Sequence, residues 1–137
     1  MTDYADVPAE VLARLRAVCL GLPESYEEPA WVGTRWRIRK RTFAHVLAID
    51  SEWPSAYVRA MRPDGPVTAL TMRSPIPELD ALTSAGHPFY RPDWGPNVLG
   101  MIVDADTDWV EVAELVTESY CIQAPKRLAA QVERPAG

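Results

Sequence analysis

The segment TRWRIRKRTFAHVLAI, residues 34–49, decides the fold because it contains two strand patterns with a reversal between them. Residues 35–40 alternate basic and apolar side chains, which is typical of a strand with one face in water. Residues 43–49 are mostly apolar and include β-branched side chains, as expected for a more central strand. Residues 41–42 leave room only for a tight reversal, so the sequence predicts an antiparallel hairpin.

Helices are predicted on both sides of this hairpin. Residues 6–20 repeat apolar side chains at helical spacing, and the Gly-Leu-Pro that follows them is typical of a helix end. Residues 108–121 form a second long helix that begins with the pattern of a capping box. Two shorter helices are expected at residues 77–85 and 126–132.

Further strands complete the pattern of a sheet. Residues 55–61 and 67–72 flank the turn sequence RPDGP, and residues 97–104 form a late strand. Residues 22–36 are expected to be a loop with at most one short extended piece. This order predicts one two-layer α+β domain, with its core at about residues 6–130, in which N- and C-terminal helices back an antiparallel sheet.

The bulk composition is that of one globular domain. The chain has 137 residues, of which 47% are apolar and 24% are charged, close to the averages for folded domains. No apolar run approaches the roughly 18 residues of a membrane span, and the acidic N-terminus lacks the pattern of a signal peptide. Cys19 and Cys121 are far apart and have no neighbouring cysteine, so reduced thiols and a cytoplasmic location are expected.

Positive charge is concentrated in the middle of an acidic chain. The net charge is −5, yet residues 35–91 carry nine lysines and arginines against five acids. Five of these cations fall within eight positions, and they are Arg35, Arg37, Arg39, Lys40 and Arg41. In a strand, the four arginines of this group would share one face. We expect Trp36 and Ile38, on the other face, to contribute to the core.

Two interpretations of this basic strip stay open. In the first, it is an exposed strand face whose arginines pair with acids on a neighbouring strand, for which Asp50 and Glu52 are available. In the second, it binds anions, chiefly the nucleic-acid backbone, because guanidinium groups match phosphate oxygens. The pI near 5.0 is far below that of a dedicated nucleic-acid-binding domain, so the charge pattern alone favours the first.

The sequence indicates no catalysis, no metal and no cofactor. It contains no phosphate-binding glycine loop, zinc-protease motif, serine-hydrolase elbow or EF-hand loop. His45 and His87 are the only histidines, and each is expected to be a hydrogen-bonded structural histidine or a surface histidine. The acidic clusters at residues 24–28 and 104–108 are expected to be solvated, since the second lacks the glycine and the final glutamate of a calcium loop.

Tryptophans suggest a second class of function. Five are many for this length, and Trp31, Trp53 and Trp94 lie in loop-like segments. Tryptophan at a loop end more often closes the edge of a core than stacks on a ligand. The alternative to nucleic-acid binding is nevertheless a protein-interaction or small-ligand-binding module that uses these loops. The sequence leaves the oligomeric state open.

Four segments, in this order, resemble the YjbR/MmcQ family of small bacterial proteins. They are LPESYEEPAW (22–31), KRTFAHVLAID (40–50), HPFYRPDWGPNVLGMIVD (87–104) and ELVTESYCIQAPKRL (114–128). The resemblance extends over about residues 11–128. Its most specific parts are the acidic, proline-containing segment after the first helix, the turn at Trp94, and the pairs Ser119–Tyr120 and Pro125–Lys126.

The resemblance implies a CyaY-like fold and a DNA-binding role, which rests on a double-wing analogy between folds. For this chain it makes the basic strip the candidate for weak phosphate contacts that do not recognise bases. The chain departs from the family pattern at residues 29–33, where Pro-Ala-Trp-Val-Gly replaces a Pro-Trp-Gly type of sequence. A frataxin-like iron site is not expected, because the first helix carries only Glu10 within it, against Arg14 and Arg16.

Overall fold

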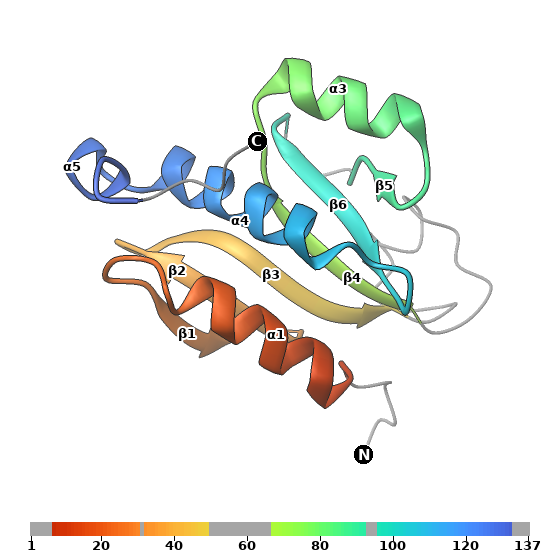
Figure 1. Cartoon of the computed structure of the whole chain (residues 1–137), viewed down its shortest axis with the longest axis horizontal. Coiled ribbons are helices and arrows are strands. Elements are labelled where there is room, and N and C mark those ends of the chain that lie inside the picture. The colour runs from red at the N-terminus through yellow and green to blue at the C-terminus, as the bar shows by residue number, and fades with distance from the viewer. Residues whose placement is uncertain (1–6, 31, 50–66, 93–95, 133–137) are drawn as a thin grey trace.

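An antiparallel sheet, crossed on one face by two helices, forms the framework of the protein (Figure 1). The computed structural model describes residues 7–30, 32–49, 67–92 and 96–132. Within these residues, six strands pair in the order β1-β2-β3-β4-β6-β5, and every neighbouring pair is antiparallel. The predicted α+β class with an antiparallel sheet is therefore confirmed, whereas the likeness to CyaY stays a prediction.

The helices and strands follow the predicted order along the chain. The strands are β1 (Tyr26–Pro29), β2 (Thr34–Ile38), β3 (Arg41–Ile49), β4 (Val67–Arg73), β5 (Phe89–Tyr90) and β6 (Val98–Val103). The helices are α1 (Ala9–Cys19), α3 (Ile76–Ala85), α4 (Trp109–Gln123) and α5 (Lys126–Ala129). The short extended piece expected after the first helix is β1, and the strand expected at residues 55–61 lies outside the described residues.

The hairpin of β2 and β3 reverses two residues earlier than predicted. Arg39 and Lys40 have φ angles of 50° and 65°, and Ile38 is paired with Arg41. Two consecutive residues with positive φ form the turn whose twist matches that of the flanking strands, although neither side chain here is the usual Asn or Gly. The prediction of a reversal at residues 41–42 was wrong, and Arg41 is the first residue of β3.

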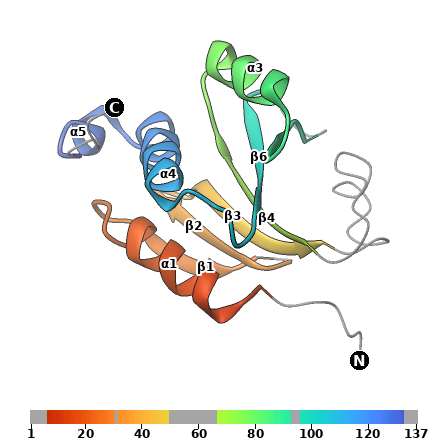
Figure 2. The ribbon, with the colours of Figure 1, turned by 45° about the vertical axis from the view of Figure 1, so that its right-hand side comes forward.

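The main core lies between the sheet and the helices α1 and α4, which Figures 1 and 2 show on the same face of the sheet. Trp36 and Ile38 point to this face and are fully buried, as predicted. Tyr120 of α4 packs edge to face against Phe43 of β3, with the ring centroids 5.4 Å apart. The other main members of this core are Leu15, Cys19, Val46, Leu70, Met72, Leu99, Met101 and Val116.

Side-chain hydrogen bonds fix both ends of α4. The Asp108 carboxylate accepts hydrogen bonds from the backbone N–H groups of Val110 and Glu111 at the start of α4, which confirms the predicted cap. At the other end of α4, the Tyr120 hydroxyl donates to the Pro23 carbonyl at 2.6 Å. This bond joins the end of α4 to the loop after α1.

Glu27 of β1 ties the sheet to α1 on the helix-covered face. Its carboxylate accepts two bonds from Arg16 Nε and Nη2 and a third from Trp36 Nε1, at 2.9 to 3.1 Å. The hydrogen bond from Arg16 is the largest reason why the pKa of Glu27 is lowered. The indole N–H of a fully buried tryptophan is thereby satisfied.

The strands β3 and β4 separate toward one end of the sheet, and α4 lies over that end (Figures 1 and 2). Their pairing ends at Ala44 and Met72. Beyond that pair, the Ser119 hydroxyl of α4 donates to the Phe43 carbonyl at 2.6 Å and accepts from the Arg73 N–H at 2.8 Å. One side chain of α4 thus replaces the direct bond between the two strands.

A smaller apolar cluster lies on the opposite face, the one turned away from α1 and α4. It consists of Leu47, Ile49 and Ala69, with Tyr90 packed against it. The Tyr90 ring covers Gly100, where an added Cβ would lie 2.4 Å from the ring. This cluster occupies the part of the sheet where β3 and β4 remain paired, and the polar residues of the same face lie beyond it.

Candidate functional site

Arg35 and Arg37 lie on the opposite face of β2, and they share one acid on β1 as their ion-pair partner. Glu28 is the partner of Arg35 in the β1–β2 register, and its Oε1 lies 2.5 Å from Arg35 Nη2 and 3.0 Å from Arg37 Nη1. The hydrogen bond from Arg37 is the largest reason why the pKa of Glu28 is lowered. The acid that compensates these arginines is therefore Glu28, while the predicted candidates Asp50 and Glu52 lie outside the described residues.

Arg39 is also paired, but with the loop that follows α1. Its Nη2 lies 3.0 Å from Glu24 Oε1. The first interpretation, arginines paired with an acid on a neighbouring strand, therefore holds for Arg35 and Arg37, whereas the expectation that four arginines share one strand face was wrong. The edge strand β1 places Glu28 beside β2, and Arg39 belongs to the turn, so it does not continue the strand alternation.

Lys40 and Arg41 are the two residues of the predicted strip with no carboxylate partner in the described part of the chain. Both are exposed at the hairpin turn. The same end of the molecule holds α5, as Figure 1 shows, and Gln123 Nε2 at the end of α4 donates to the Thr42 carbonyl at 3.0 Å. Lys126 and Arg127 of α5 are likewise exposed and have no acid partner among the described residues.

We call Lys40, Arg41, Lys126 and Arg127 the basic end. It combines two cations of the predicted strip with two that charge counting along the sequence did not single out. Lys126 belongs to a segment that resembles the family. Only the position of α5, at the same end of the molecule as the hairpin turn, associates Lys126 with Lys40 and Arg41 (Figure 1). The basic end is defined by the charge and exposure of these four side chains.

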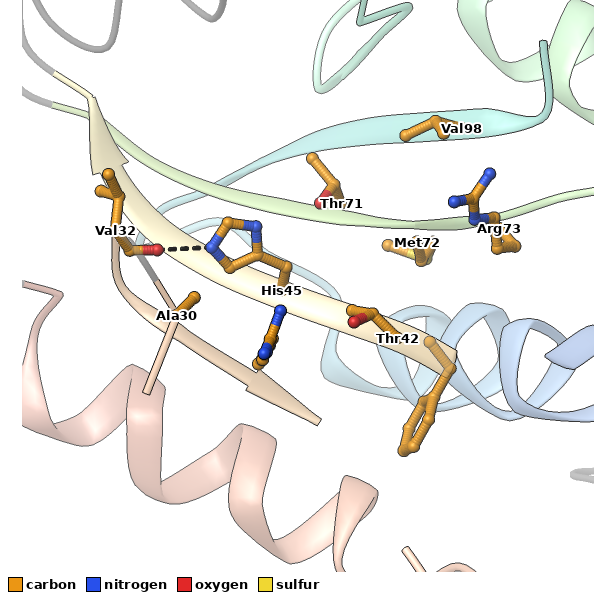
Figure 3. Close-up of a pocket in the computed structure, with 10 residues that line it drawn as sticks. Ala30, Val32, Thr42, His45, Thr71, Met72, Arg73 and Val98 are labelled. Atoms are coloured by element: carbon orange, nitrogen blue, oxygen red, sulfur yellow. Dashed lines mark hydrogen bonds between the residues drawn. The ribbon is translucent and has the colours of Figure 1, made fainter. Parts of the chain in front are cut away.

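A cavity of about 310 Å³ lies on the opposite face, where β3 and β4 separate (Figure 3). We call it the arginine cavity, because Arg35 of β2 and Arg73 of β4 both line it. Its other polar lining residues are Thr42, His45 and Thr71, and its apolar lining residues are Ala30, Val32, Phe43, Met72 and Val98. A volume of this size lies at the lower end of the range for small-molecule sites.

His45 is fixed in the wall of the arginine cavity. Its Nε2–H donates to the Val32 carbonyl at 2.5 Å, as the dashed line in Figure 3 shows. A carbonyl can only accept, so Nε2 carries the proton of the neutral ring. Burial lowers the pKa of His45, and nearby Arg35 acts in the same direction, whereas the bond to Val32 opposes them. The prediction of a hydrogen-bonded structural histidine is confirmed for His45.

The two arginines of the cavity retain hydrogen-bonding capacity. Arg73 Nη1 donates to Asn97 Oδ1 at 2.8 Å, and Arg73 has no carboxylate partner among the described residues. Arg35 Nε is buried and has no acceptor within the same residues. A buried N–H without an acceptor lowers stability by about 1–3 kcal/mol. An acceptor that reached Arg35 Nε would therefore be bound favourably.

The remaining sequence candidates are distributed elsewhere. Arg91 pairs with Asp80 at 3.0 Å, and His87 Nε2 lies 3.8 Å from Asp104 Oδ2 on the surface. Trp31, Trp53 and Trp94, which carried the alternative function, lie outside the described residues, as do Arg59 and Arg62. Across the described ranges, no group of three or more potential metal ligands was found, and no helix has the length and apolar character to cross a bilayer.

The fold and its surface define a small α+β protein with a basic end and a cavity that contains two arginines. The YjbR family model matches residues 20–122, which is most of the chain, so the chain belongs to the YjbR family. This confirms the resemblance found in the sequence. No match was found among curated proteins.

One solved structure has the same fold. It is the crystal structure of Deinococcus radiodurans protein DR2400, which carries the DUF419 domain. The TM-score is 0.62 at 17% sequence identity, and the alignment covers 90% of this chain and 88% of that chain. At this level of identity the likeness shows a common fold and carries no information on function.

Proposed function

We propose that this YjbR-family protein binds the DNA backbone weakly and without sequence preference, and that the basic end makes the principal contacts. The observation that carries the proposal is the exposure of four cations at one end of the molecule without acid partners in the described chain. When an unpaired cation contacts a phosphate, counterions condensed on the DNA are released, which favours binding. A cation in an ion pair must first separate from its carboxylate.

The paired arginines of the predicted strip have a smaller part in this proposal. Arg35 and Arg37 would have to leave Glu28, and Arg39 would have to leave Glu24, before they could contact phosphate. Of the five residues predicted from the sequence, Lys40 and Arg41 are the preferred contacts. With only four phosphate contacts on an acidic protein, the affinity is expected to be low and strongly dependent on salt.

The proposal includes no catalytic step. His45 is held by a backbone carbonyl in the arginine cavity, and exposed His87 lies at the far end of β6, beside Asp104. It also places the protein in the cytoplasm, where Cys19 and Cys121 would remain the free thiols that they are here.

The test is a fluorescence-anisotropy titration of a labelled mixed-sequence DNA duplex at several salt concentrations. Neutralising the basic end with K40Q, R41Q, K126Q and R127Q together is expected to abolish measurable binding. For the wild type, four contacts predict a slope of log K against log salt of about −3.6, or a loss of roughly 100-fold between 50 and 200 mM salt.

The control is a variant with R14Q and R91Q, which removes two exposed arginines that are paired elsewhere, with Glu10 and Asp80. It is expected to bind like the wild type. Equal binding by the variant with the neutralised basic end, or no wild-type binding at the lowest salt, would contradict the proposal. A loss of binding in both variants would show that net charge alone is responsible and would also reject the basic end as the site.

A further inference from the structure

The arginine cavity is a second cationic site. It differs from the basic end because it is a cavity with a defined lining. It lies beside the point where the β3–β4 pairing ends, and Thr42, Thr71 and Arg73 line it (Figure 3). Arg35 and Arg73 are both cations, and the described lining residues include no acid. Arg35 lies against Glu28 at the edge, whereas the side-chain partner of Arg73 within the described part of the chain is the neutral Asn97 amide.

The donors of the cavity suit an oxyanion. A guanidinium group presents five N–H donors in a planar fork, and within the described residues Arg73 uses one of them on a side-chain partner. The Thr71 side chain is buried beside it, with 6% of its surface exposed. Arg35 lines the neighbouring side of the cavity and adds a second positive charge there.

The apolar lining limits the kind of anion. Val32 lies at one end of the cavity and Val98 at the other, so a ligand would meet aliphatic side chains beyond its charged group (Figure 3). Inorganic anions make no use of such contacts, whereas a carboxylate attached to a short apolar body uses both parts of the lining. The shape and chemistry of the site therefore favour an organic acid over a free inorganic ion.

Another hollow, of about 480 Å³, is larger but less suited to an anion. It is lined by residues of α1 and of the loop between β6 and α4, among them Glu10, Asp104 and Arg14. Its arginine is already engaged, because Arg14 lies over the Trp109 ring at 5.3 Å and 3.7 Å from Glu10. Two carboxylates and one engaged cation make this hollow a poor anion site.

We propose that the arginine cavity binds a small organic carboxylate, with Arg73 as the principal charge partner, Thr71 as a further donor and Arg35 as a second nearby cation. The carboxylate replaces water around the Arg73 fork, and the apolar body of the ligand packs against Val32 and Val98. This inference goes beyond the proposed DNA contacts and uses none of the residues of the basic end, so either proposal can fail alone.

The experiment titrates benzoate into the full-length protein and follows backbone amide shifts in two-dimensional ¹H–¹⁵N NMR spectra. Saturable shifts are expected at millimolar concentration, at the amides of β3, β4 and the β1–β2 connection. Benzamide has the same ring and no charge, and it is expected to cause no saturable shift. Inorganic phosphate serves as a third probe of anion binding without an apolar body.

Two variants test Arg73 in different ways. R73M removes the guanidinium. N97D keeps Arg73 but replaces its neutral partner by a carboxylate, at the position where Asn97 Oδ1 lies 2.8 Å from Arg73 Nη1. Each is expected to weaken benzoate binding by roughly 10- to 100-fold, as for loss of a hydrogen bond to a charged group. R91M, an exposed arginine that pairs with Asp80 outside the cavity, is expected to bind like the wild type.

The N97D variant keeps the test valid if R73M does not fold. Four results would overturn the proposal: no saturable shift with benzoate, equal binding by N97D, shifts that map to the hollow near Arg14, or saturation by phosphate but not by benzoate. Saturable binding of benzoate that N97D abolishes and R91M retains would support it, whatever the outcome of the DNA titration.

Discussion

On the helix-covered face of the sheet, Trp36, Ile38 and Leu70 are fully buried, whereas on the opposite face Arg35, Arg37 and Arg73 stay partly exposed. The same strands thus supply the core on one side and the candidate sites on the other. The face covered by α1 and α4 contributes the main hydrophobic core. The face without these helices carries partly exposed arginines.

Two adjacent residues of β1 show how sharply the faces differ. Glu27 points to the helices, where it binds Arg16 and accepts the Trp36 indole N–H. Glu28 points the other way, where it forms ion pairs with both Arg35 and Arg37. Because side chains alternate along a strand, one position separates a structural carboxylate from one that controls the available positive charge.

The largest effect is expected at Ser119, where the helix-covered face replaces a missing strand pair. S119A removes an acceptor for the Arg73 N–H and a donor to the Phe43 carbonyl. We expect a loss of about 1–3 kcal/mol in the free energy of unfolding, measured by urea denaturation, because two backbone groups lose their partner. T83A, which removes a hydroxyl bonded within α3, should cost less than about 0.5 kcal/mol. Equal losses in both variants would contradict this account.

An intermediate effect is expected from the pH titration of His45 on the opposite face. The folded-state pKa of His45 is lowered by burial, so the unfolded chain, with a pKa near 6.5, takes up the proton first. Stability should therefore fall as the pH drops below about 6.5, and stop falling once the pH is below the folded-state pKa. The slope from one such group cannot exceed about 1.4 kcal/mol per pH unit.

The variant H45Q should remove this acid-side loss, because glutamine can donate to the Val32 carbonyl without titrating. The measurement is the urea midpoint between about pH 5 and 8, the range in which histidine titrates. H87Q is the matched control, because it makes the same substitution at the exposed histidine outside the arginine cavity. A profile of H45Q that matches the wild type would exclude His45 as its source.

The smallest effect, expected at Glu28, distinguishes the two glutamates of β1. E28Q leaves Arg35 and Arg37 without their acid, so DNA affinity at low salt should rise a few-fold. If both arginines then reach phosphates, the salt slope should steepen by about 1.8. E27Q should lower the urea midpoint and leave DNA affinity unchanged, because Arg16 and Trp36 lie on the helix-covered face. An unchanged DNA affinity of E28Q would show that the ion pairs do not restrain these arginines.

Sequence reasoning succeeded where the signal lay within a few residues. The alternation around Trp36 and Ile38 predicted which side of β2 is buried, and Asp108 predicted the first residue before α4. It failed by two residues at the hairpin turn, because Arg39 and Lys40 adopt positive φ angles without the glycine or asparagine that usually signals them. The turn is held by the pairing of Ile38 with Arg41, which no local pattern reveals.

The candidate sites were less predictable, because their residues meet only in the folded chain. Arg35 and Arg37 were identified as cations, but their neutralisation depended on β1, a four-residue edge strand within a segment expected to be mainly loop. Arg73 carried no local signal beyond its charge. Its place in a cavity follows from the separation of β3 and β4, which requires Ser119, a residue 76 positions from Phe43.

The sequence by itself determined most of the described helices and strands, the buried side of the hairpin, the family and the excess of positive charge in the middle of the chain. These properties depend on periodicity, capping and composition, which act over one or two turns of helix or a few residues of strand. Only the tertiary structure decided which cations are neutralised and where a cavity forms. Those outcomes depend on strand order and on contacts between distant segments, since the charge of a side chain is fixed by its chemistry but its partner is fixed by topology.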